Sequence, residues 1–96
     1  MNLRTLAKGQ ACQLRIPGVC NHNPETTVLC HIRRGGIAGV GQKPPDICGV
    51  WGCSDCHALI DGRAPTRMTR AEVDSIILEG LLRTLAELTK LGAIRW

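Results

Sequence analysis

Six cysteines are the residues whose types and spacing most directly indicate chemistry in this chain of 96. Cys53 and Cys56 are separated by two residues, a spacing that suits two thiolate ligands of one metal ion. Cys12 and Cys20 flank a loop with Pro17-Gly18, which can fold back and bring a second pair together. Structural zinc takes four tetrahedral ligands, commonly two from a turn and two from the start of a helix. The sequence therefore predicts a structural zinc ion held by Cys12, Cys20, Cys53 and Cys56.

The same cysteines could instead form disulfides or a redox pair. Disulfides need an oxidising compartment, but the first ten residues, MNLRTLAKGQ, contain no apolar run of signal-peptide length. No segment approaches the roughly 20 apolar residues of a membrane span. We therefore expect a cytoplasmic protein with reduced thiols and no membrane partner. A redox pair is disfavoured because the βαβ context of thioredoxin-like sites is absent.

Two further cysteines and one histidine are weaker ligand candidates. Cys30 and Cys48 compete with the first pair, although a free cysteine is most often a small buried apolar side chain. His22 follows Cys20 by two residues, and we expect it to be a loop residue rather than a ligand.

Length and composition favour one domain spanning residues 1–96. Its N-terminal part has few large apolar side chains with which to form a core. Trp51 and Trp96 are the only aromatic residues, and most glycines and prolines precede residue 67. A metal ion would stabilise such a loop-rich region. The net charge is +4, and the excess lies in residues 1–67, with eight basic and four acidic side chains. This sign is the one expected of a polyanion-binding face.

A long helix is predicted over residues 69–91. Thr69 and Glu72 fit a capping box, and apolar residues then follow helical spacing. Gly80 lies mid-helix, which favours a close contact there. Three further leucines widen the apolar stripe, and the sequence leaves open whether they pack on the metal-binding part or form a homodimer through this helix. These leucines are Leu78, Leu82 and Leu91.

Residues 12–62 are predicted to contain loops, two short strands and a short helix. The β-branched segment 26–32 suits a strand, and alternation places His31 and Cys30 on opposite faces. A second strand is predicted over residues 47–51, and a helix over residues 54–60.

This order of elements resembles the core of the HNH (His-Me finger) endonucleases. Paired cysteines, a strand ending in His31, a second strand, and then Cys-x-x-Cys-His57 opening a helix are similar to the ββα-metal core in its treble-clef zinc form. The resemblance covers about residues 12–62, and zinc-binding treble clefs without nuclease activity share much of it. It implies an α+β fold: a small zinc-stabilised treble-clef, ββα-metal domain with a long C-terminal α-helix at 69–91.

The resemblance also implies site roles. His31 would be the general base, and His57 would bind a catalytic Mg²⁺ or Mn²⁺. Asp46 lies near the family's middle Asn and would orient His31 or bind metal, unless it is only a turn residue after the prolines. Arg33 and Arg34 would bind phosphate, unless they are solvated surface charges.

One residue departs from the family pattern. Members usually carry an Asp just before the base histidine, as a second metal ligand, and this chain has Cys30 there. Because a thiolate is a poor partner for Mg²⁺, either Asp46 substitutes, a softer metal such as Mn²⁺ or Zn²⁺ is used, or the site is weak.

Two functions remain open at the level of sequence. The first is hydrolysis of DNA phosphodiester bonds by a metal-dependent HNH endonuclease, with DNA bound by the basic N-terminal part. The second is a non-catalytic zinc-binding adaptor that docks on DNA or on a phage or host recombination protein through its helix. Catalysis requires both imidazoles to face one open point, whereas an adaptor does not.

Overall fold

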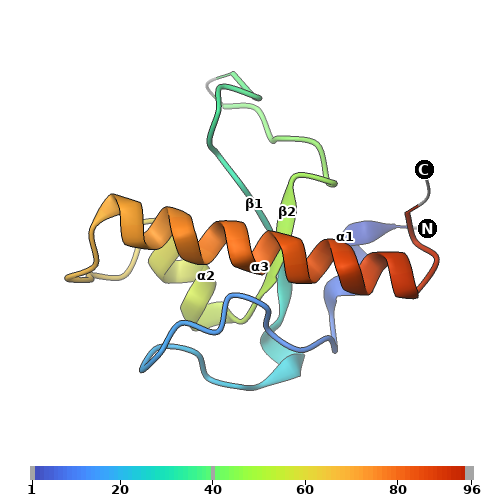
Figure 1. The fold of residues 1–96 in the computed structure, drawn as a ribbon, viewed down its shortest axis with the longest axis horizontal. Helices are drawn as coiled ribbons and strands as arrows, with labels where there is room; N and C mark the ends of the chain where they lie inside the picture. The colour runs from blue at the N-terminus through green and yellow to red at the C-terminus, as the bar shows by residue number, and fades with distance from the viewer. Residues whose placement is uncertain (1, 40, 95–96) are drawn as a thin grey trace.

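A two-stranded antiparallel hairpin lies at the centre of the computed structural model, which describes residues 2–39 and 41–94. Strand β1 (Val28–His31) pairs with β2 (Gly49–Gly52), so that Val28 lies opposite Gly52 and His31 opposite Gly49. The long connection between the strands projects from the body of the molecule (Figure 1). Both predicted strands are confirmed. The first begins later than predicted because Pro24–Thr26 forms a 3-10 turn, η1, capped by the Asn23 side chain.

The two predicted helices are confirmed. Helix α2 (Ser54–Ile60) has Cys53 as its N-cap, and α3 (Arg70–Lys90) has Thr69 as its N-cap. Both halves of the capping box are present: the Thr69 hydroxyl accepts from the Glu72 N–H, and the Glu72 carboxylate accepts from the Thr69 N–H. These bonds satisfy backbone donors that the first turn leaves without partners. The structure is therefore a small α+β fold with a long C-terminal helix.

Helix α3 crosses the hairpin and contacts β2, as Figure 1 shows. The crossing point is Gly80, where an added Cβ would lie 2.9 Å from Val50 Cγ2 and 3.0 Å from the Gln13 carbonyl oxygen. One turn further along α3, the Thr84 hydroxyl accepts a 3.1 Å bond from the Trp51 N–H. The close contact predicted for this glycine is thus present, and it explains a residue that otherwise weakens a helix.

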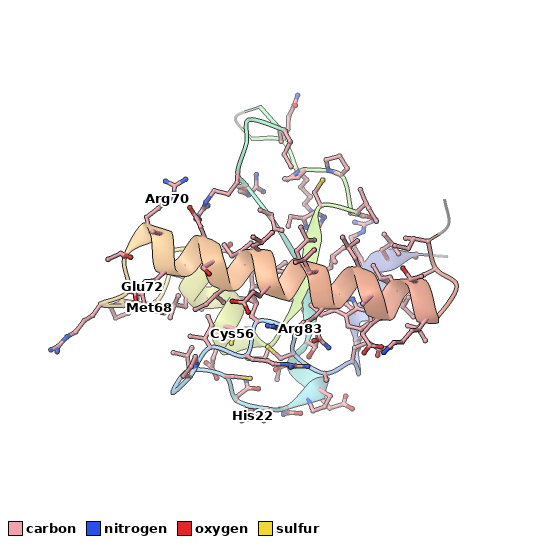
Figure 2. The ribbon with its side chains drawn as sticks, viewed as in Figure 1. His22, Cys56, Met68, Arg70, Glu72 and Arg83 are labelled. Atoms are coloured by element: carbon pink, nitrogen blue, oxygen red, sulfur yellow. The ribbon has the colours of Figure 1, made fainter. Side chains whose placement is uncertain are left out.

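The backbone of Gln13 joins three parts of the chain. Its N–H donates to the Trp51 carbonyl at 2.7 Å, beside β2. Its carbonyl accepts from the guanidinium of Arg83, which extends from α3 toward the N-terminal loop in Figure 2. The loop that begins at Cys12 is therefore fixed against both the sheet and the helix.

A short N-terminal helix was not predicted. Helix α1 (Leu3–Ala7) is capped by the Asn2 side chain, which accepts from the backbone of the first turn. Ala7 is fully buried in a small core with Leu29, Trp51 and Leu88. Five residues carry too little periodicity to be recognised in the sequence, and tertiary packing stabilises this helix.

The outer face of α3 remains exposed. Packing against the rest of the protein buries Val73, Ile77 and Leu88, as an apolar stripe requires. It does not cover the leucines that widen the stripe: Leu78, Leu82 and Leu91 are 57%, 58% and 46% exposed. The helices formed by residues 2–39 and 41–94 are all too short or too polar to cross a membrane.

Candidate metal centre and catalytic cleft

Four cysteine side chains converge at the start of α2. The Sγ atoms of Cys12, Cys20, Cys53 and Cys56 all lie within 4.8 Å of one another. The Sγ atoms of Cys20 and Cys53 are 3.9 Å apart. A tetrahedral zinc ion with Zn–S bonds of about 2.3 Å places its sulfur ligands about 3.8 Å apart. The four residues are therefore close enough together to hold one metal ion.

Local structure brings the two pairs together. Cys53 is the N-cap of α2, and its sulfur accepts a 3.4 Å bond from the Cys56 N–H. The first pair is drawn to this helix by the Gln13 contact with β2 and by a turn in which the Cys20 N–H donates to the Ile16 carbonyl. In the view of Figure 2, Cys56 lies between α3 and the loop that carries His22.

The thiols of the cluster share charge. A hydrogen bond with Cys56 lowers the pKa of Cys12 to about 4, and the same contact raises the pKa of Cys56. The thiolate form is thus favoured at Cys12 over Cys56, and a cation between the sulfur atoms would favour further deprotonation. The cluster is therefore chemically suited to a metal ion.

The remaining cysteines lie outside this cluster. Cys30 is fully buried, on the face of β1 opposite His31, and burial raises the pKa of its thiol to about 12. Cys48 is half-buried at the end of the long loop. Exposed His22 has its Nδ1 3.7 Å from the Cys20 Sγ. Cys30 therefore presents no thiolate to the side of the sheet where His31 lies.

His31 and His57 line one open cleft of about 500 Å³. His31 ends β1, and His57 lies on the first turn of α2, directly after the cluster residue Cys56. The cleft is lined by Arg4, Val28, Leu29, His31, Arg33, Lys43, His57 and Asp61. Two imidazoles, three cationic side chains and a carboxylate therefore face one space.

Each histidine is held by a carboxylate. The Nε2 atom of His31 lies 2.8 Å from Asp46 Oδ1, and this hydrogen bond holds the pKa of Asp46 below its usual value. The Nε2 atom of His57 lies 3.1 Å from Asp61 Oδ2, one helical turn further along the chain. A nitrogen and an oxygen this close could share one divalent cation. The carboxylate oxygen suits Mg²⁺ or Mn²⁺, whereas the imidazole nitrogen better suits a transition metal such as Zn²⁺.

The two predicted arginines occupy different positions. Arg33 lines the cleft, with its guanidinium donating to the Gln42 carbonyl at 2.8 Å. Arg34 does not line this cleft: it pairs with Asp74 of α3 at 2.8 Å and lines a smaller adjacent pocket with His31 and Asp61. The structure thus brings Arg33 together with the histidines, and it places Arg34 at the junction of the long loop and α3.

Three charged residues of the cleft, Asp61, Lys43 and Arg4, were not predicted as site residues from the sequence. Asp61 directly follows the helix predicted over residues 54–60, and its spacing of four from His57 is the signal that could have placed both on one helix face. Lys43 precedes the two prolines before Asp46 and carries no comparable signal. Arg4 carries no local signal, because only the packing of α1 brings it to the cleft.

This chain is similar to proteins whose names or sources associate them with bacteriophages. A family model described as "YbcO: Putative nuclease YbcO" matches residues 1–93. Relatives named "Putative nuclease YbcO", from Escherichia coli (strain K12), and "Putative nuclease ybcO", from Enterobacteria phage 82, are each 47% identical over 94 residues. In both cases the match covers 98% of this chain and 97% of the relative.

A solved structure has the same fold. It is described as "Structure of a putative bacteriophage protein from Escherichia coli str. K-12 substr. MG1655". The similarity has a TM-score of 0.78 at 43% sequence identity, and it covers 95% of this chain and 100% of that chain.

Proposed function

The chain belongs to the family described as "Putative nuclease YbcO", and we propose that it is a metal-dependent endonuclease of the HNH type that hydrolyses DNA phosphodiester bonds. The DNA would be that of a phage or prophage during recombination or processing. The observation that carries the proposal is that His31 and His57, from different elements, line the same basic cleft. In this proposal the hairpin and α2 form a ββα-metal core.

His31 is the general base in this scheme. Its Nε2 is engaged by Asp46, which leaves Nδ1 to accept a proton from water that attacks the phosphorus atom. Asp46 holds the ring in one orientation and stabilises the imidazolium that forms. This pairing favours orientation of His31 over metal binding as the role of Asp46.

His57 and Asp61 would hold the catalytic divalent ion, Mg²⁺ or Mn²⁺. When bound, such an ion stabilises negative charge on the phosphate and on the leaving oxygen. Because the Cys30 side chain is buried on the face of β1 opposite His31, the carboxylate of Asp61 would supply the acidic ligand that the family's preceding Asp provides. Arg33 binds phosphate in the cleft, whereas Arg34 fixes the long loop to α3.

Structural zinc at the four cysteines has a positioning role in this proposal. It fixes the N-terminus of α2, and with it the first turn that carries His57. The thiols would be reduced, as they are in the cytoplasm.

A nicking assay tests the proposal. Purified protein with supercoiled plasmid and Mg²⁺ or Mn²⁺ should produce nicked circles. His31→Ala should slow nicking by about 10² to 10⁴-fold, the usual contribution of a general base, without changing the zinc content. His22→Ala removes a histidine outside the cleft and should leave the rate unchanged. Equal rates for the wild type and His31→Ala would exclude His31 as the base.

The exposed leucines of α3 favour a second candidate, the zinc-binding adaptor. Leu78 and Leu82 are both more than half exposed and lie one turn apart. A docking face of this kind would contact DNA-associated proteins such as a phage or host recombination protein, or a second copy of the chain. The adaptor predicts binding that survives loss of both cleft histidines, and no metal-dependent cleavage.

A further inference from the structure

Helix α1 brings a cation into the cleft from outside the region that resembles HNH enzymes. One side of this helix is anchored, because Ala7 is fully buried and Leu3 and Leu6 pack against the same core. Arg4 lies on the same helix and lines the cleft together with His31 and Arg33. The fold therefore fixes its position with respect to both histidines.

Arg4 is held at one end of its guanidinium group. Its Nε lies 3.5 Å from Asp46 Oδ2, the carboxylate oxygen that does not contact His31. The side chain is 57% exposed. A guanidinium has five N–H donors in a fixed fork, and the described residues offer no hydrogen-bond partner to its two terminal nitrogens. Those donors remain available to an oxygen-rich ligand.

The charges of the cleft select the kind of ligand. Arg4 comes from α1, Arg33 follows β1, and Lys43 lies near the far end of the long loop. Asp61 is the acidic residue among the cleft-lining side chains. A single phosphate requires only one guanidinium fork, whereas cations on separate elements suit a ligand with several phosphates along its length.

We propose that Arg4 is a second phosphate-binding residue, which contacts the nucleic-acid backbone at a phosphate next to the one that Arg33 binds. The inference rests on the proposed function to the extent that the cleft is the nucleic-acid site. Helix α1 then belongs to the substrate site, and a strand of DNA crosses the cleft from α1 to the base of the long loop.

The test is the salt dependence of DNA binding by His31→Ala protein, measured without Mg²⁺ or Mn²⁺ so that the duplex stays intact. The logarithm of the binding constant for a short duplex falls linearly with the logarithm of salt concentration, with a slope of about −0.9 per phosphate contact. Adding Arg4→Gln should make the slope shallower by about 0.9 and weaken binding at low salt. Arg4→Lys, which keeps the charge, should restore the slope.

Lys8→Gln is the matched control. Lys8 ends the same helix and carries the same charge, but it lines a separate hollow with Asn2 and Gln10. Its replacement should leave the slope unchanged, and far-UV circular dichroism should match for all variants. An unchanged slope in Arg4→Gln, an equal change in Lys8→Gln, or no duplex binding by the parent would each overturn the inference. If the wild-type protein does not nick plasmid but the slope still depends on Arg4, the nuclease proposal is wrong and the phosphate-binding role of Arg4 stands.

Discussion

The Nε2 atom of His31 lies 2.8 Å from Oδ1 of Asp46, a residue 15 positions later in the chain. The hydrogen bond to His31 lowers the pKa of Asp46, so this carboxyl is ionised at neutral pH. An ionised carboxylate only accepts hydrogen bonds, so Nε2 must carry the ring proton. In the neutral ring Nδ1 then keeps the lone pair, which is the state that a general base requires.

Asp46→Asn tests this assignment of the ring proton. The amide has the same shape but no charge, and it can donate to the ring as well as accept from it, so the tautomer is no longer fixed. We expect plasmid nicking to slow by at least about tenfold, within the range of general-base effects. Glu79→Gln removes an exposed carboxylate of α3 and should not change the rate. An Asp46→Asn protein that nicks at the wild-type rate would contradict the assignment.

Removal of the metal from the four-cysteine cluster should unfold the N-terminal half. Structural zinc in small domains contributes folding free energy on the order of 10 kcal/mol. We expect one zinc ion per chain by elemental analysis, and loss of helical signal with a strong chelator. Cys53→Ser should abolish metal retention, because it removes a ligand that also caps α2. Cys48→Ser should retain zinc, and a variant that loses it would place Cys48 among the ligands.

Gly80→Ala should destabilise the protein, although alanine is the better helix former. The new Cβ would lie within about 3 Å of Val50 Cγ2 and the Gln13 carbonyl, which belong to the sheet and the metal-binding loop. Overpacking of this kind costs about 1–3 kcal/mol. Urea unfolding measures the change, and Ala86→Gly at an exposed site of α3 calibrates helix propensity at about 1 kcal/mol. A more stable Gly80→Ala protein would show that the crossing is looser than described.

The capping box of α3 should make stability depend on pH. Bonding to the Thr69 backbone and hydroxyl lowers the pKa of Glu72. A carboxyl whose pKa is lower in the folded state stabilises the protein above its unfolded pKa, and the effect is lost as pH falls through the folded value. The difference in unfolding free energy between wild type and Glu72→Gln should therefore be largest near pH 7 and shrink toward pH 3. A difference independent of pH would show that the charge of Glu72 is not involved.

The sequence was sufficient for elements with strong local signals. The capping residues and apolar spacing of α3, the β-branched run of β1 and the Cys53-x-x-Cys56 turn each predict local geometry without tertiary information. The pairing of Cys12 with Cys20 was predicted from a loop that could fold back, and the structure places both sulfurs in the cluster.

Residues brought together by packing could not be found this way. Arg34 pairs with Asp74, 40 positions away, and nothing near either residue in the sequence indicates the other. Arg4 lines the cleft because burial of Ala7 fixes α1 against the core. No periodic pattern in the sequence predicts this packing. Short helices and long-range ion pairs depend on contacts that a local pattern does not contain.

His31 and Asp46 also stand at the two ends of the projecting loop between the strands, so the pair closes the neck of that loop. In the proposed mechanism the described residues of the glycine-rich tip take no part in proton acceptance by His31. Under the proposed function, a change in the length or charge of the tip would alter the contacts with DNA and leave the paired His31 and Asp46 side chains in place.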